Sequence, residues 1–333
     1  MSFKNVIGHQ KQIELLQRAI INDKVVHSYL FFGNEGIGKR WVALQFAKAL
    51  NCLERGAEEG DACDRCISCR KIDGALHPDV SFLEPEGPSQ LIKVEAMRQM
   101  QRELAFRPYE GKRRVCVLTT ADRMAPEISN TLLKTLEEPP LHTVMILLAN
   151  SARVLLPTIL SRCQQIPFNP LPFPSLIQWL VEQKGLHGEE AHLFAALSEG
   201  SPGKALTLQE DIRRIPREDI LKGWLGAETF SFGEIERWIE SLPSNWEDLI
   251  LILEVAKTLL RDLVVSKVLK DRAKLIHSDL VHEIRALSSR RSLSFLLNQL
   301  ESIHQTRLIL NPKPRIVNTT LALEAMMLSW AEG

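Results

Sequence analysis

The stretch YLFFGNEGIGKR, residues 29–40, joins a short apolar run to a glycine-rich loop. The loop meets three fixed positions of the phosphate-binding pattern G-x-x-x-x-G-K-[ST], with Gly33, Gly38 and Lys39. Apolar residues then recur at helical spacing over residues 42–50. A strand, a glycine loop and a helix in this order form the context in which backbone N–H groups bind phosphate. The stretch therefore predicts a phosphate-loop fold.

The rest of the first half repeats the alternation of strand and helix. Short apolar runs occur at residues 80–83, 115–118, 144–149 and 166–168, and helical patterns occur at residues 8–23, 91–104 and 126–136. Strands that alternate with helices predict a parallel sheet covered on both faces. From about residue 171 only helical patterns continue. We therefore expect an α/β domain at 1–167, a small helical domain at 168–208 and an all-α domain at 209–333.

Composition is typical of a globular protein, with 45% hydrophobic and 25% charged residues in a chain of 333. A formal net charge of zero argues against a protein that grips nucleic acid alone, so nucleic-acid contact should be local or shared with partners. The first residues show no apolar signal region, and no apolar stretch reaches the length of a membrane span. We expect a cytoplasmic protein.

The loop lacks the residues that would hold a magnesium ion. Arg40 stands where a Ser or Thr hydroxyl would bind the metal, and a guanidinium offers no oxygen. The second ligand should be an acid after the strand at 115–118, but Thr119 and Thr120 follow it, and Asp122 is the first carboxylate. Because hydrolysis of ATP needs the metal, these two defects predict its loss. They leave open whether the backbone still binds nucleotide.

Four of the six cysteines form the pattern C-x10-C-x2-C-x2-C, at Cys52, Cys63, Cys66 and Cys69. Four thiolates complete a closed tetrahedral Zn²⁺ site, which is structural because no coordination position stays open. The alternative is four unrelated thiols in a loop, which the clustering disfavours. Cys116 falls within a strand run and reads as a small buried hydrophobe.

Five segments, VIGHQKQIELLQRAI, HSYLFFGNEGIGKR, HPDV, NTLLKTLEEPP and LPTILSRCQ, resemble in content and order those of bacterial clamp-loader subunits. These subunits belong to DNA polymerase III and to the AAA+ family, and the closer likeness is to the delta-prime group rather than to gamma/tau. The motifs cover about the first half. The resemblance implies an AAA+ module, a helical lid and an all-α collar that assembles with gamma/tau and delta. It also implies a role in loading the sliding clamp onto primed DNA during replication.

The resemblance assigns residues as well. It implies a degenerate phosphate loop at Gly33, Gly36, Gly38, Lys39 and Arg40, and a structural zinc module at Cys52, Cys63, Cys66 and Cys69. Ser161-Arg162-Cys163 matches a Ser-Arg-Cys motif whose arginine enters the ATP site of the next subunit, so Arg162 is expected to act as an arginine finger in trans. A guanidinium suits this task because it is always charged and binds phosphate through two donors.

The departures from gamma/tau decide between two functions. The acidic pair of gamma/tau falls on Thr119 and Thr120, and its lid arginine falls near Gly203. These differences favour a non-hydrolysing subunit, a non-catalytic member of the polymerase holoenzyme, over an ATP-hydrolysing motor of the gamma/tau type. Residues 112–114, Lys-Arg-Arg, are interpreted as a solvated strand entry rather than a DNA-facing patch.

Overall fold

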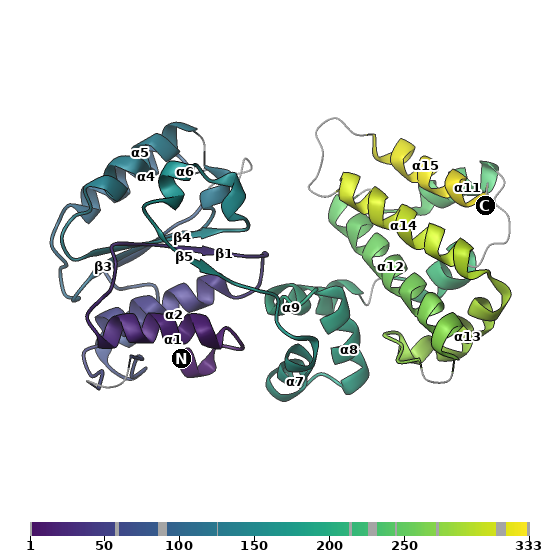
Figure 1. Ribbon diagram of the computed structural model, residues 1–333, viewed down its shortest axis with the longest axis horizontal. Coiled ribbons are helices and arrows are strands. Elements are labelled where there is room, and N and C mark those ends of the chain that lie inside the picture. The colour runs from purple at the N-terminus through teal and green to yellow at the C-terminus, as the bar shows by residue number, and fades with distance from the viewer. Residues whose placement is uncertain are drawn as a thin grey trace. The chain divides into compact units, whose positions relative to one another are not determined.

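The structure is a computed structural model that describes residues 2–56, 60–85, 92–124, 126–212, 215–225, 232–243, 245–270, 273–310 and 318–331. The chain forms two compact units, which are drawn in Figure 1. Unit 1 comprises residues 1–175 and 200–204, and unit 2 comprises residues 176–199 and 205–333. The expected three-part division at residues 167 and 208 stays a prediction.

Unit 1 is built on a five-stranded parallel sheet with the order β2-β3-β4-β1-β5. The strands are β1 (Ser28–Phe32), β2 (Val80–Leu83), β3 (Arg114–Leu118), β4 (Thr143–Ala149) and β5 (Gln164–Pro167). The prediction of an α/β fold with a parallel sheet is confirmed. Only β5 differs appreciably, since it begins two residues before the apolar run; Gln164 and Gln165 are exposed on an edge strand, where polar residues are tolerated.

Helices cover both faces of this sheet, with α1 and α2 on one face and α4, α5 and α6 on the other (Figure 1). The helical elements of unit 1 are η1 (Phe3–Asn5), α1 (Gln10–Ile21), α2 (Lys39–Asn51), α3 (Ile67–Asp73), α4 (Val94–Leu104), η2 (Ala121–Arg123), α5 (Pro126–Glu137), η3 (Ala152–Val154) and α6 (Pro157–Leu160). Successive strand residues serve opposite faces: Phe31 packs in the core that contains Phe46 of α2, and Leu30 packs in the core that contains Leu132 of α5.

Within the described ranges, all secondary-structure elements after β5 are helices, as expected. The elements are α7 (Phe173–Lys184), α8 (Gly188–Leu197), α9 (Pro202–Asp211), α10 (Arg217–Asp219), η5 (Ile220–Trp224), α11 (Phe232–Ser241), α12 (Trp246–Leu269), η7 (Ser278–Leu280), α13 (Val281–Arg290), α14 (Leu293–Leu310) and α15 (Thr319–Ala331). α12 is the central helix of unit 2, with Leu253, Leu259 and Leu263 fully buried against its neighbours. Among the described helices, none combines the length and apolarity of a membrane span.

Candidate functional site

The glycine loop lies at the edge of the sheet where the strands end. β1 ends at Phe32, and α2 begins at Lys39 with Gly38 as its N-cap. Gly36 and Gly38 have φ angles of 71° and 108°, a conformation that disfavours other residues. At Gly33, an added Cβ would lie 2.2 Å from the carbonyl oxygen of Phe168. The geometry therefore requires glycine at all three positions.

The ammonium group of Lys39 donates hydrogen bonds to oxygen atoms of the glycine loop and of the residue after β4. Its side chain is buried, and Nζ donates to the carbonyl oxygens of Gly33 and Asn34 (2.8 Å for Asn34) and to Oδ1 of Asn150 at 3.3 Å. Burial lowers the pKa of Lys39 to about 8, and the nearby charges of Asp122 and Glu35 oppose that change. The lysine thus sits where a phosphate loop needs it, held by protein oxygens.

The sequence patterns did not identify Asn150 as a site residue. It directly follows β4, the strand beside β1, so its amide lies at the same edge as the loop. The signal was present in the sequence, because Asn150 directly follows the apolar run of six residues at 144–149. A parallel sheet gathers such strand-end residues at one edge.

Arg40 points to the end of β2. Its Nη2 lies 2.5 Å from Oε1 of Glu84, and its guanidinium lies over the ring of Phe82, 5.1 Å from the centroid. The pair is about half exposed, so it contributes little to stability. At the position where a phosphate loop has a metal-binding hydroxyl, this chain therefore has a guanidinium that is paired with the carboxylate of Glu84.

The residues after β3 supply no carboxylate at the strand end. Thr119 donates its hydroxyl to the carbonyl oxygen of Leu83 at 3.2 Å, and the buried hydroxyl oxygen of Thr120 has no hydrogen-bond partner in the described part of the chain. Asp122 lies in η2, the turn that follows, and its Oδ2 accepts from the backbone N–H of Asn150 at 3.1 Å. One of its two carboxylate oxygens is therefore engaged in a structural hydrogen bond.

Two further segments of unit 1 hold the glycine loop. Gly203 donates its N–H to the carbonyl oxygen of Gly36 at 2.8 Å, and Ser201 donates its hydroxyl to the carbonyl oxygen of Glu35 at 2.9 Å. A Cβ at Gly203 would lie 2.8 Å from that same Gly36 oxygen, so glycine permits the close approach. Nε2 of His9, the N-cap residue of α1, donates to the carbonyl oxygen of Ile37 at 2.8 Å.

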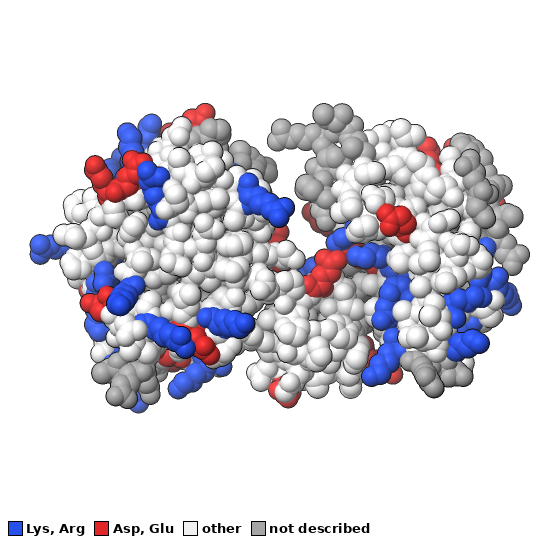
Figure 2. Space-filling view, viewed as in Figure 1, with Lys and Arg blue, Asp and Glu red and all other residues white. Residues whose placement is uncertain are grey.

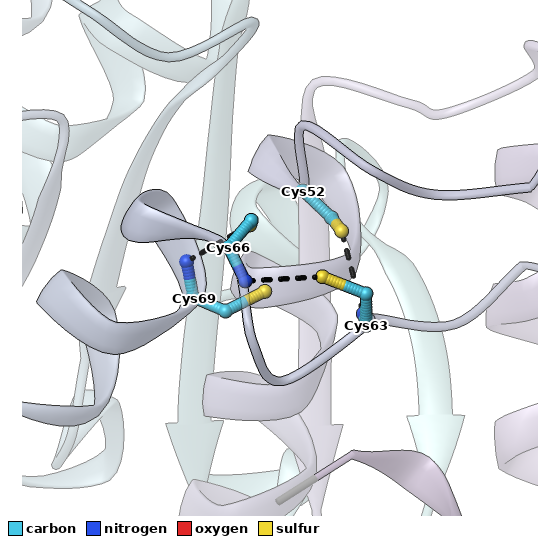
Figure 3. A group of neighbouring side chains, drawn as sticks. All are labelled: Cys52, Cys63, Cys66 and Cys69. Atoms are coloured by element: carbon cyan, nitrogen blue, oxygen red, sulfur yellow. Dashed lines mark hydrogen bonds between the residues drawn. The ribbon is translucent and has the colours of Figure 1, made fainter.

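The four clustered cysteines converge on one point (Figure 3). Cys52 follows α2, Cys63 lies in the connecting segment, Cys66 caps α3 and Cys69 lies within that helix. Their sulfur atoms all lie within 4.8 Å of one another. Ligands at the Zn–S distance of about 2.3 Å in a tetrahedron would be roughly 3.8 Å apart, so this donor set fits a zinc ion after a small contraction.

Backbone N–H groups point at three of the sulfur atoms. Cys63 donates to Sγ of Cys52 and Cys66 donates to Sγ of Cys63, both at 3.3 Å, and Cys69 donates to Sγ of Cys66 at 3.4 Å. Burial would raise the pKa of Cys66, but the N–H groups of Cys69 and Leu53 overcome it and lower the pKa to about 6. Such donors favour the thiolate form that binds metal.

A buried lysine fastens the cysteine segment to α2. The Lys48 side chain is fully buried, and its Nζ lies 2.5 Å from Oδ1 of Asp64 and 2.8 Å from both carboxylate oxygens of Asp73. Asp64 stands between the cysteines and Asp73 ends α3, so one cation links both parts to the helix that starts at the glycine loop.

Arg162 lies at the other edge of the sheet, where the strands begin. It precedes β5, and its carbonyl oxygen accepts from the Ser28 hydroxyl at 2.6 Å, at the first residue of β1. The five residues of β1 separate this point from the loop by roughly 15 Å, at about 3.3 Å per residue. The Arg162 side chain is 35% exposed, and its Nη2 lies 2.9 Å from Oε1 of Glu137. Arg162 and the chain's own phosphate loop therefore lie at opposite edges of the sheet.

The interpretation of residues 112–114 as a solvated strand entry is wrong for Arg114. Its side chain is 14% exposed and contacts the fully buried carboxylate of Asp79 at 3.0 Å. Burial would raise the pKa of Asp79, but N–H groups of Tyr109, Glu110 and Gly111 and the charge of Arg114 hold it below its usual value. The local sequence pattern could not reveal this ion pair, because Asp79 lies 35 residues before Arg114.

Charges of both signs are interspersed on the face of unit 1 drawn in Figure 2, and most of that face is neither basic nor acidic. This distribution agrees with the zero net charge. A broad basic footprint is the usual mark of a protein that binds nucleic acid by itself. The face shown does not carry one.

Comparison with known proteins gives consistent matches. The family described as "DNA polymerase III, delta subunit" matches residues 8–172, and "DNA polymerase III, delta subunit, C terminal" matches residues 236–332. The chain is 29% identical to DNA polymerase III subunit delta' of Bacillus subtilis, over 100% of this chain and 99% of that protein. It is 37% identical to subunit delta' of Pseudomonas aeruginosa, over 59% of this chain and 60% of that protein.

The similarity extends to a second kind of subunit. DNA polymerase III subunit tau of Bacillus subtilis is 30% identical over 62% of this chain and 37% of that protein. Among solved structures, a gamma subunit-related protein of Thermotoga maritima is 20% identical, covers 96% of this chain and 99% of its own, and superposes with a TM-score of 0.48. That superposition is too weak to add to the sequence matches.

Proposed function

The chain belongs to the DNA polymerase III delta-subunit family, and on that premise we propose that it is a non-hydrolysing subunit of the bacterial replicative clamp loader. In this role it helps to load the sliding clamp onto primed DNA. Its partners are the gamma/tau and delta subunits, and it reaches the clamp and DNA through their complex. The full-length match to a delta' subunit supports this assignment.

The incomplete magnesium site carries the non-hydrolysing part of the proposal. At the loop, Arg40 is paired with Glu84 and provides no metal-binding oxygen. At the end of β3, Thr119 and Thr120 stand where a carboxylate would complete the site. Phosphoryl transfer relies on the metal to neutralise charge on the phosphates, so a site lacking both ligands should not hydrolyse ATP.

The position of Arg162 supports a role in trans. It lies at the amino ends of the strands, and the chain's own loop lies at their carboxyl ends. In hydrolysis a water oxygen bonds to the γ-phosphorus as the bond to the bridging oxygen breaks, and negative charge spreads over the phosphate oxygens. We assign Arg162 to stabilise that charge on ATP held by a neighbouring motor subunit.

The cysteine cluster is proposed to hold one structural Zn²⁺. Cys52, Cys63, Cys66 and Cys69 supply four sulfur ligands, which leaves no position for a substrate. The cluster is joined to α2 through Lys48, and α2 begins at the glycine loop. The ion would therefore stabilise the segment that follows α2 rather than take part in a reaction.

The intact part of the loop favours the rival function, an ATP-hydrolysing motor of the gamma/tau type. Gly33, Gly38 and Lys39 retain the geometry of a phosphate loop. An assay of phosphate release by the purified chain, with a Lys39→Ala variant beside it, separates the two functions. We expect background release from both proteins. Turnover that disappears in Lys39→Ala would establish the motor function instead, whereas nucleotide binding without turnover agrees with the proposal.

A further inference from the structure

The loop between α4 and β3, residues 105–113, presents two aromatic rings to solvent. The side chain of Phe106 is 68% exposed and that of Tyr109 is 83% exposed. Within the described part of the chain, neither ring stacks on another ring or lies under a cation. Aromatic side chains carry a large apolar area that folding usually buries. Two such rings left open on one loop therefore indicate a contact surface.

One buried carboxylate holds the backbone of this loop. Asp79 accepts hydrogen bonds from the backbone N–H groups of residues 109–111 at 2.7–2.8 Å. The guanidinium of Arg114 donates to Asp79 at 3.0 Å and to the carbonyl oxygen of Arg107 at 3.4 Å. Because the backbone is already fixed, a ligand that contacts the two rings avoids the entropic cost of ordering it.

The charges of the loop are mainly positive. Arg107 and Lys112 are exposed, and neither side chain has an ion-pair or hydrogen-bond partner among the described residues. Glu110 is the one carboxylate of the loop, and its Oε2 lies 2.6 Å from Nζ of Lys71. Two cations without partners and two exposed rings on the same loop favour a ligand that has both negative charge and flat apolar groups.

A single strand of nucleic acid has both features, since each nucleotide carries a phosphate and a base. Aromatic side chains stack on bases of any sequence, while Lys and Arg contact the backbone. In a duplex the base faces are stacked on one another, so the two rings would find no base to contact. The sequence alone favoured a solvated strand entry for Lys112, but the exposed rings of the same loop favour a contact with a ligand.

We propose that residues 106–112 bind single-stranded nucleic acid. The rings of Phe106 and Tyr109 stack on bases. The side chains of Arg107 and Lys112 contact phosphates of the same strand. The inference rests on the proposed function for its setting, since that function brings the chain to primed DNA, which has a single-stranded template. A contact this local is compatible with the zero net charge of the whole chain.

The test measures binding of a fluorescein-labelled oligothymidylate of about 20 nucleotides to the full chain, by fluorescence anisotropy at about 50 mM salt. Phe106→Ala and Tyr109→Ala should each weaken binding roughly 5- to 150-fold, which corresponds to about 1–3 kcal/mol per stacked base. Tyr109→Trp should bind at least as tightly as the parent, because an indole ring also stacks. Tyr109→Leu should bind as weakly as Tyr109→Ala, because it has no ring.

The salt dependence of binding tests the phosphate contacts. Arg107→Gln and Lys112→Gln should each reduce the slope of log K against log salt by about 0.7, the value for one phosphate of a single strand. Two variants serve as matched controls and should bind like the parent. Lys11→Gln changes an exposed lysine of α1, and Phe173→Ala removes a ring of α7 that is 42% exposed. Melting should be unchanged in the loop variants, because Asp79 binds backbone N–H groups there.

Several results would overturn the inference. These are undetectable binding of the strand, equal affinities of the parent and both alanine variants, or an equal affinity for a blunt duplex of the same length. Parent-like binding by Tyr109→Leu would also contradict it, because apolar contact would then replace stacking and the surface would suit a protein partner. An oligouridylate of the same length distinguishes RNA from DNA as the natural strand, and tighter binding of either one agrees with the inference.

The inference and the proposed function can fail separately. Three strand spacings of about 4.8 Å separate the starts of β3 and β5, so Arg162→Gln should bind the oligothymidylate like the parent. Failure of the parent to bind the strand, with reduced ATP turnover in a complex containing Arg162→Ala, would overturn the inference and leave the proposed function. Binding that depends on the two rings, with parent-like turnover in that complex, would support the inference and overturn the trans-acting role of Arg162.

Discussion

Replacing Lys48 with Ala should open the cysteine segment while the sheet stays folded. The ammonium group is fully buried and contacts Asp64 and Asp73 at 2.5–2.8 Å. Without it, both carboxylates lose the cation that they share. Removing one partner of a buried ion pair costs about 3–5 kcal/mol. The two carboxylates are 29% and 37% exposed and can recover some hydration, so we take the lower end, about 3 kcal/mol.

A cost of about 3 kcal/mol raises the population of the opened segment roughly 150-fold. Amide hydrogen exchange measures that population directly, since exchange requires local opening. The amides of Cys63, Cys66 and Cys69 donate to sulfur atoms in the closed segment and are the reporters. Their exchange in the metal-loaded protein should accelerate by roughly two orders of magnitude. Amides of β1 and β4 should keep their parent rates.

Lys71→Ala is the matched control. Lys71 also pairs with one carboxylate, Glu110, at 2.6 Å, but both side chains are about one-third exposed. Its loss should cost less than about 1 kcal/mol and change exchange less than about fivefold. Equal exchange rates in Lys48→Ala and the parent would refute the reasoning. So would equal acceleration in β1, since that would mean global rather than local opening.

Three further outcomes are expected. Arg40→Thr restores a hydroxyl but should still release phosphate at background rate, because Thr119 and Thr120 leave the second metal ligand missing; turnover in a phosphate-release assay would contradict this. Elemental analysis should find about one zinc per chain, and its absence from native protein would remove the proposed site. His277 is buried with its pKa lowered to about 3 from 6.5, so the unfolded chain takes up a proton first as pH falls below 6.5. The His277 contribution to the free energy of unfolding should be complete above pH 6.5 and about 2 kcal/mol lower at pH 5, at 1.36 kcal/mol per pH unit. Urea unfolding at a series of pH values, followed by tryptophan fluorescence, should show this decrease, and it should be absent in His277→Gln.

Local sequence patterns were sufficient to predict the strand, loop and helix at the start of unit 1. The apolar runs and the glycine loop act over neighbouring residues, so β1, the loop and α2 could be expected from residues 29–50. The cysteine spacing was equally informative, because C-x2-C segments bring ligands together whatever surrounds them. In the structure those four sulfur atoms do gather.

Contacts between distant residues could not be read in this way. Arg40 pairs with Glu84, Arg114 with Asp79, and Arg162 with Glu137. Each pair joins segments that are far apart in the sequence, so it forms only when the fold brings them together. Gly203 illustrates the same limit. Its sequence context suggested a missing arginine, whereas the structure shows a backbone that approaches the Gly36 oxygen and leaves no room for a Cβ.

The central claim, that this chain acts on a neighbour's ATP and not on its own, is tested most directly by Arg162→Ala in the reconstituted complex. An arginine finger is worth about 10³–10⁵ in rate at its site, or roughly 4–7 kcal/mol. The variant should fold and assemble normally, because the Ser28 hydroxyl bonds to the backbone of residue 162 and not to its side chain. ATP turnover of the complex should fall in part, and clamp loading, which needs the sites to act together, should fall further. A variant complex that assembles normally and loads clamps at the parent rate would contradict the account.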